Sequence, residues 1–369
     1  MAEPQRVQAH RHLALTTPAD AALVPLPPQP AGVAWPVADP DGWPIGPASA
    51  AVEAHVDDLI ADTDRFGTTY AVLVFQGGRL LVERYGGAIP HFDRPPEQVD
   101  ATTQLLSWSM AKSILHAAVG VLVGDGALDV HAPANVPSWH LTPDDARAAI
   151  TLEHLLSMRD GLDFAEDYVD AGVSDVIEML FGTGKDDVAA FAEARPLRCE
   201  PGTRFNYSSG TSNIVSAIAA RAAGGGAELV ALLRDRVLEP IGMTSADCRR
   251  DEAGTFIASS YVYATARDYA RFGLLYLRDG VWDGRRLLPE RWVDHGRRHR
   301  SFDEEGNGYG AHWWVVGDDM GSFRASGYEG QSIQLVPGLD MMVVRLGHST
   351  AEMYPALGAW RADLVDLFR

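Results

Sequence analysis

Two β-hairpin patterns lie near opposite ends of this chain, and the residues between them are mostly helical in pattern. Residues 70–85, YAVLVFQGGRLLVERY, form two β-type runs around a Gln-Gly-Gly turn. Residues 332–347, SIQLVPGLDMMVVRLG, form a second pair around Pro-Gly-Leu-Asp, and residues 309–316, YGAHWWVV, add a predicted third strand. These positions predict one antiparallel sheet that contains strands from both ends of the chain.

Helical patterns fill the rest of the chain. Residues 48–62 are amphipathic, and the last segment repeats its apolar residues at three- and four-residue steps, at Leu357, Trp360, Leu364 and Leu367. We therefore expect an α/β (α+β) fold, with an antiparallel sheet flanked by helices and an inserted all-helical domain. The predicted boundaries are a proline-rich arm at 1–47, an α/β domain at 48–108 and 255–369, and a helical domain at 109–254.

Composition narrows the functional classes. A formal net charge of −19 argues against nucleic-acid binding, because phosphates favour basic surfaces. The chain shows neither a signal-peptide pattern nor an apolar run long enough to span a membrane, so the expected location is cytoplasmic, without membrane contact. The two cysteines, Cys199 and Cys248, are expected as thiols, with a bridge between them left open. The histidines lack nearby carboxylates at ligand spacing, so we predict no metal and no cofactor.

One of only two lysines in the chain stands three residues after a serine. In LLSWSMAKSILHAAVG (105–120), Ser109 opens a helix-compatible segment and Lys112 follows one helical turn later. Apolar neighbours favour a buried lysine with a lowered pKa, which could act as a base toward the serine hydroxyl. The alternative is an N-capping serine followed by an exposed lysine, and the tetrapeptide alone favours neither.

A second segment supports the catalytic interpretation. CEPGTRFNYSSGTSNIV (199–215) predicts a turn, a short extended piece that ends near Tyr207, and a helix. A tyrosine of depressed pKa, held near a lysine, can carry a proton between nucleophile and leaving group.

At this point the chain resembles a known superfamily. Ser109-Met110-Ala111-Lys112, PGTRFNYSS and ASGYEGQ (325–331) together are similar to the serine β-lactamases and penicillin-binding proteins. The resemblance is to the class C-like branch, with its family VIII carboxylesterases and 6-aminohexanoate-oligomer hydrolases, and it covers roughly residues 50–369. It implies an α/β domain, an all-helical domain and an active site between them.

The resemblance also implies a mechanism. Ser109 would form an acyl-enzyme that water hydrolyses, while Lys112 and Tyr207 share the acid–base work. The backbone N–H groups of Ser109 and Tyr328 would hold the oxyanion, next to Gly327. The expected substrate is then a small-molecule ester or amide. Whether the protein forms a homodimer is left open.

Two departures from the family pattern bear on the substrate. The family's Lys-Thr-Gly is Ala325-Ser326-Gly327 here, so the cation that pairs with a β-lactam carboxylate is missing. Its Tyr-x-Asn ends in Ser209. Both changes favour esters or linear amides over β-lactams and D-Ala-D-Ala peptides, which remain the alternative. Ser209, Ser326 and Gly327 are predicted substrate contacts.

The acidic loop LDFAEDYVDAG (162–172) is the last candidate region. The nylon-oligomer hydrolases carry a tyrosine at this place near the scissile amide, which makes Tyr168 a substrate-binding candidate. Glu166, Asp167 and Asp170 could attract a cationic amine of the substrate, or form a solvated acidic loop. A Ser-His-Asp hydrolase is disfavoured because Gly-x-Ser-x-Gly is absent. The alternative of another class is a catalytically silent binding module on the same fold.

Overall fold

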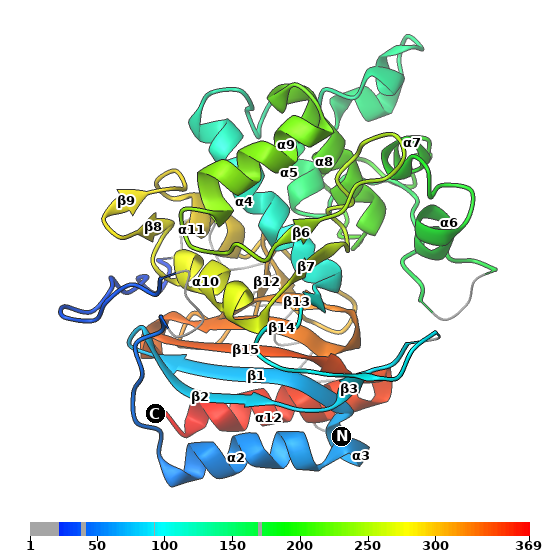
Figure 1. The fold of residues 1–369 in the computed structure, drawn as a ribbon. Coiled ribbons are helices and arrows are strands. Elements are labelled where there is room, and N and C mark those ends of the chain that lie inside the picture. The colour runs from blue at the N-terminus through cyan, green and yellow to red at the C-terminus, as the bar shows by residue number, and fades with distance from the viewer. Residues whose placement is uncertain (1–21, 38–41, 92, 169–171) are drawn as a thin grey trace, which may run out of the picture.

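A computed structural model describes residues 22–37, 42–91, 93–168 and 172–369 (Figure 1). An eight-stranded antiparallel sheet forms its centre. Across the sheet the strands are β10 (Ser301–Phe302), β11 (Gly308–Tyr309), β12 (Trp314–Val315), β13 (Phe323–Gly327), β14 (Gln331–Val336), β15 (Met341–His348), β1 (Thr68–Gln76) and β2 (Arg79–Tyr85). β1 pairs with β15, so the two ends of the chain share one sheet and the predicted fold class is confirmed.

The predicted strand at 309–316 is two short strands, which corrects the sequence interpretation. Its centre leaves the sheet at His312, whose φ of 53° is a left-handed conformation that a strand cannot contain. The backbone N–H of His312 donates to the carbonyl of Leu156 at 3.0 Å. A tertiary contact therefore interrupts the strand between β11 and β12.

Two helices cover one face of the sheet, α2 (Ala50–Ala61) and α12 (Tyr354–Asp366), as Figure 1 shows. Alternate residues of β1 separate the faces: Val72 and Val74 join the apolar cluster beneath α2 and α12, and Leu73 joins the cluster on the other side. The expected apolar stripe of α12 is present except at its end. Leu367 follows the last residue of the helix and is 44% exposed.

The opposite face carries α10 (Ala266–Leu277), and above it lies a group of helices. This group contains α4 (Ala111–Gly124), α5 (Leu152–Leu156), α6 (Asp175–Phe181), α7 (Val188–Glu193), α8 (Ser209–Ala223) and α9 (Gly226–Leu233). α4 and α8 run through its centre, and most of their residues are buried. One apolar cluster includes residues of α4, α8, α10 and the sheet, so the helices are anchored on the strands. The residue boundaries of the two domains stay a prediction.

The remaining α-helices and strands of the described residues are short. They are α3 (Thr63–Phe66), α11 (Trp292–Arg297), β3 (Ala88–Ile89), β4 (Glu97–Gln98), β5 (Leu105–Leu106), β6 (Asp247–Cys248), β7 (Val262–Ala264), β8 (Val281–Trp282) and β9 (Arg285–Arg286).

The described part of the predicted arm lies on the fold without helices or long strands. Arg278 donates to the carbonyl of Pro27 and to Gln29 Oε1, and Trp35 packs against Trp282 with ring centroids 4.9 Å apart. Residues 1–21 and 38–41 of the arm lie outside the described residues. Both cysteines are free thiols. Over the described ranges no single helix could cross a membrane, although the bent pair Ser209–Ala223 and Gly226–Leu238 passes the length and composition test when taken together.

Candidate active site

Ser109 lies in a single 3₁₀ turn, η1 (Trp108–Met110), that leads directly into α4. Lys112 follows one turn later on the same side, and its Nζ donates to Ser109 Oγ at 2.9 Å. Ser109 is 8% exposed whereas Lys112 is 1% exposed. The pair therefore places a slightly exposed serine directly against a fully buried amine.

The amine of Lys112 has two further partners. Nζ donates to Ser209 Oγ at 3.1 Å and to the carbonyl of Ser259 at 3.0 Å, so three acceptors match its three protons when it is charged. Burial lowers the pKa of Lys112 from 10.5 to about 8, and the carboxylate of Glu166 partly opposes this shift. Near neutral pH a useful fraction of the lysine is thus a neutral base.

Tyr207 stands just before α8 and faces the same pair. The centroid of its ring is 4.9 Å from Lys112 Nζ, and its side chain interacts with that of Ser109. The expected depression of its pKa is wrong. Burial, followed by the charge of Glu166, raises the pKa of Tyr207, and the interaction with Ser109 offsets only part of this rise. Tyr207 is therefore a neutral phenol that can accept one proton while it donates another.

Glu166, in the 162–172 loop, joins the hydrogen-bond network around Lys112 through Ser209. Its carboxylate accepts hydrogen bonds from Ser209 N at 2.7 Å, Ser209 Oγ at 2.6 Å and Tyr168 Oη at 2.6 Å. Glu166 is thus part of the internal structure, which does not fit the expected attraction of a substrate amine. Asp170 lies outside the described residues.

Ser209 lies between the acid and the base. It is fully buried, donates to Glu166 and accepts from Lys112. This burial favours a role in positioning Lys112 over the predicted substrate contact. The Tyr-x-Ser spacing pointed to Ser209, but no sequence pattern indicated that its partner would be Glu166.

Aromatic side chains surround the nucleophile. Tyr168 stacks on Tyr328 with ring centroids 4.7 Å apart, and Trp108 meets the same ring edge-on at 5.5 Å. On the other side Tyr207 packs against Trp314 at 5.3 Å. Tyr168 therefore lies beside the predicted oxyanion residue, and aromatic rings flank the segment that carries Ser109.

The end of β13 approaches the nucleophile closely. A Cβ at Gly327 would stand 2.4 Å from the carbonyl oxygen of Ser107 and 3.1 Å from Trp108 Cβ, so only glycine fits here. The φ of Trp108 is 45°, a strained value for this residue type. This contact brings the backbone of Tyr328 beside the turn that carries Ser109. The oxyanion role of the two N–H groups stays a prediction.

The two residues before Gly327 point to opposite faces of the sheet. Ala325 is 1% exposed and joins the apolar cluster on the α10 side, so no cation occupies the family's lysine position. Ser326 faces the side of α12, where its Oγ accepts a hydrogen bond from Arg324 Nε at 3.0 Å. Its contact with substrate also stays a prediction.

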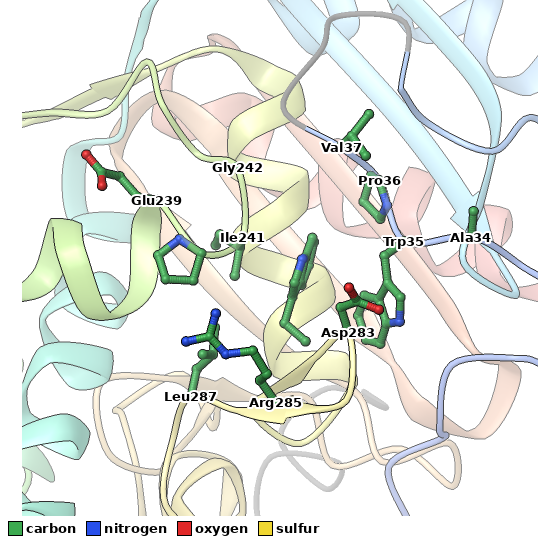
Figure 2. A pocket seen from close by; sticks show the side chains of 12 residues that line it. Ala34, Trp35, Pro36, Val37, Glu239, Ile241, Gly242, Asp283, Arg285 and Leu287 are labelled. Carbon is green, nitrogen blue, oxygen red and sulfur yellow. The ribbon is translucent and has the colours of Figure 1, made fainter.

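A surface cavity of about 510 Å³ lies elsewhere (Figure 2). Its walls come from residues 34–37 of the arm, residues 239–242 after α9, and the β8–β9 hairpin. Figure 2 shows Trp35, Asp283 and Arg285 around it. It contains none of the residues around Ser109. Among the described residues no group of three or more His, Cys, Asp or Glu side chains could hold a metal ion.

Comparisons with known proteins agree with this geometry. The 6-aminohexanoate-dimer hydrolase of Paenarthrobacter ureafaciens is 28% identical over 304 residues, which cover 75% of this chain and 72% of that protein. A Bacillus anthracis protein assigned as a 6-aminohexanoate-dimer hydrolase superposes with a TM-score of 0.70 at 20% identity, over 98% of this chain and 94% of the other. EstCE1, a hydrolase with promiscuous acyltransferase activity, gives a TM-score of 0.66 at 17% identity, over 85% and 98%.

The family model described as Beta-lactamase matches residues 52–367, nearly the whole of the described fold. Because this match spans far more than half of the chain, and because the sheet, the helices and the Ser109–Lys112 pair occur together within it, the protein belongs to the β-lactamase family.

Proposed function

We propose that this protein is a serine hydrolase that cleaves carboxylic esters or linear amides through an acyl-enzyme on Ser109. The observation that carries the proposal is the 2.9 Å hydrogen bond between Ser109 Oγ and a buried lysine whose pKa falls to about 8. A solvent-exposed lysine would stay charged at neutral pH and could not accept the serine proton.

The proposed reaction has two halves. The proton of Ser109 passes into the Lys112–Tyr207 pair while Oγ attacks the substrate carbonyl, and the same pair protonates the departing alcohol or amine. Backbone N–H groups of Ser109 and Tyr328 hold the oxyanion. Water then repeats the sequence on the acyl-enzyme, releases the carboxylic acid and restores Ser109.

The surroundings of Ser109 indicate the class of substrate. Aromatic rings flank the segment that carries Ser109, and Ala325 occupies the family's lysine position, so no lysine recognises a carboxylate at that point. These features favour a neutral group next to the scissile bond over a β-lactam. The name of the 28% identical relative supports a linear amide, and that of EstCE1 is compatible with an ester.

A hydrolysis panel on the purified protein tests the proposal. The panel contains p-nitrophenyl butyrate, a chromogenic cephalosporin, a D-Ala-D-Ala peptide and the linear 6-aminohexanoate dimer. We expect turnover of the ester or the linear amide and none of the cephalosporin. Cephalosporin turnover above that of the ester, or no hydrolysis of any compound, would refute the proposal.

The only other lysine provides a matched control for the role of Lys112. Lys185 is exposed and paired with Asp186 at 2.7 Å. Lys112→Ala should lower kcat by about 10²- to 10⁴-fold, the usual range for loss of an acid–base group. Lys185→Ala should keep the parent rate. Equal rates in both variants would remove Lys112 from the mechanism.

A further inference from the structure

Three arginines gather on the face of the sheet that is covered by α12, away from Ser109. Strand register places two of them on this face: Arg324 of β13 is opposite Gln334, and Arg345 of β15 is opposite Ser332. The third, Arg361, lies on α12 one turn after Leu357, which packs onto the same face. Figure 1 shows α12 across this side of the sheet. We call Arg324, Arg345 and Arg361 the arginine cluster.

Among the described residues no carboxylate stands in direct contact with the arginine cluster. Other buried arginines of this chain have an acid directly against them, as Arg271 has Asp268 and Arg297 has Asp294, both at 2.7 Å. Within the described part of the chain no member of the arginine cluster forms an ion pair. Buried charges without a partner are costly, so their retention calls for an explanation.

Neutral partners satisfy Arg345 but leave Arg324 and Arg361 with few hydrogen bonds. Arg345, 1% exposed, donates only to hydroxyl and carbonyl oxygens, such as Ser349 Oγ at 2.8 Å and the carbonyl of Glu329 at 2.9 Å. Arg324 gives one hydrogen bond, from Nε to Ser326 Oγ. Arg361 has no hydrogen bond with any other described residue. Two guanidinium groups therefore keep most of their donors available.

The charges of the cluster act on one another. Burial, followed by the charges of Arg324 and Arg345, lowers the pKa of Arg361 to about 9, so it still carries a proton at neutral pH. Burial lowers the pKa of Arg324, and the charge of Asp303 opposes this effect only in part. The carboxylate of Asp303 is itself held by Asn307, through N at 2.7 Å and Nδ2 at 2.8 Å. Burial likewise lowers the pKa of Arg345 against the smaller opposing effect of Glu329. The repulsion among the three cations is thus left without a direct counter-charge.

An unpartnered hydroxyl stands in the same place. Ser332 is 2% exposed, lies opposite both Ser326 and Arg345, and its Oγ has no hydrogen-bond partner. Buried hydroxyls nearly always have a partner in folded proteins. Ser332 therefore offers a free hydroxyl on the same face of the sheet as the guanidinium groups, an observation that is independent of their charge.

We propose that Arg324, Arg361 and Ser332 bind a phosphate group between β13, β14 and α12, with Arg345 adding charge behind them. Three positive charges fit a multiply charged ligand better than a single carboxylate. The planar forks of two arginines match tetrahedral oxyanions in paired hydrogen bonds, and the hydroxyl supplies one more donor. Arg324 and Arg361 are both partly exposed, so such a ligand can enter from solvent.

Titration of inorganic phosphate into the full chain tests this proposal. Calorimetry and thermal unfolding are recorded at pH 7 in sodium chloride adjusted to constant ionic strength, with acetate as the comparison anion. We expect one phosphate per chain and a rise of Tm with phosphate concentration, because a ligand that binds the folded state stabilises it. The same titration with phenyl phosphate shows whether the site prefers free phosphate or a phosphorylated small molecule, because the preferred ligand binds more tightly. Tighter binding of either compound supports the site.

Three variants localise the binding. Arg361→Gln should weaken phosphate binding by about 10-fold or more and Ser332→Ala by several-fold, as expected for charge-assisted hydrogen bonds. Arg234→Gln, which removes an exposed arginine paired with Asp235, is the control and should bind as the parent does. Unchanged binding in Ser332→Ala and Arg361→Gln, no phosphate binding by the parent protein, or acetate binding as tight as phosphate would each overturn the proposal.

Discussion

Replacing Glu166 by glutamine should move the pH dependence of hydrolysis toward acid. Glu166 raises the pKa of Lys112 against the larger effect of burial. Ser209 Oγ is 2.6 Å from Glu166 Oε1 and 3.1 Å from Lys112 Nζ. The carboxylate oxygen and the amine therefore lie at most about 5.7 Å apart. At that distance, with an effective dielectric constant of about 20, a carboxylate stabilises a cation by roughly 3 kcal/mol, which corresponds to about two pH units.

The direction of the shift in the pH profile follows from the charge that the substitution removes. Glu166→Gln removes a negative charge that favours the protonated lysine, so the neutral base forms at lower pH. In the parent protein kcat/KM should rise with pH through about 8, the pKa of Lys112. In the variant this rise should occur about one to two pH units lower, because the neutral amide no longer stabilises the charged form of Lys112.

The assay is the initial rate on p-nitrophenyl butyrate from pH 5 to 10, corrected for spontaneous hydrolysis. Asp163→Asn serves as the matched control, because Asp163 belongs to the same loop but is exposed, with Arg198 3.9 Å away. Water screens its charge, so its profile should coincide with that of the parent. A Glu166→Gln profile that is unchanged, or that moves toward alkali, would contradict the assigned electrostatics.

Further predictions concern Tyr207 as the proton carrier, the contact of Gly327 with the Ser107 carbonyl, and the stability of the fold in acid. Tyr207→Phe should lower kcat by about 10²- to 10⁴-fold with little loss of stability, and a near-normal rate would exclude its role. Gly327→Ala should lower kcat/KM by about 10²-fold, because its Cβ would stand 2.4 Å from the Ser107 carbonyl and displace the strand; unaltered kinetics would show that this approach is dispensable. Burial lowers the pKa of His312 from 6.5 to about 3, so the unfolded chain binds more protons between those values. The free energy of unfolding, measured in urea, should therefore fall as pH drops through that window, by up to roughly 5 kcal/mol from this group, and His312→Asn should remove that part; an identical slope in the variant would contradict it.

The sequence predicted the parts of the fold that depend on local pattern. The alternation in residues 70–85 and 332–347 and the apolar stripe that begins at Leu357 reappear as β1, β2, β14, β15 and α12. The strand expected around His312 was wrong because a contact with Leu156, distant in sequence, holds the backbone in a left-handed conformation. No local preference reveals such a contact.

In the candidate site, too, some contacts follow from local sequence and others depend on the tertiary structure. Ser109 and Lys112 lie one helical turn apart, so their contact follows from spacing alone. Glu166 was one of several acids in a loop, and only the position of the α8 N-terminus, with Ser209 at its start, selects it. The raised pKa of Tyr207 likewise depends on the three-dimensional burial of its ring.

The arginine cluster combines residues from three separate segments, so no single motif contains it. One signal was present in the sequence: Ser332 and Gln334 alternate with apolar residues in a strand that is buried on both faces. Polar residues at alternate positions of such a strand indicate a polar layer beneath α12. The identity of its partners required the register of β13 and β15.

The most direct test of the account is the site of covalent labelling by a fluorophosphonate, read by mass spectrometry of peptides from the treated protein. The account predicts a single adduct on the peptide that carries Ser109, with labelling that increases as pH rises through about 8 and disappears in Ser109→Ala. An adduct on another residue, labelling that persists in Ser109→Ala, or an unlabelled parent protein would contradict the claim that Ser109 is the nucleophile.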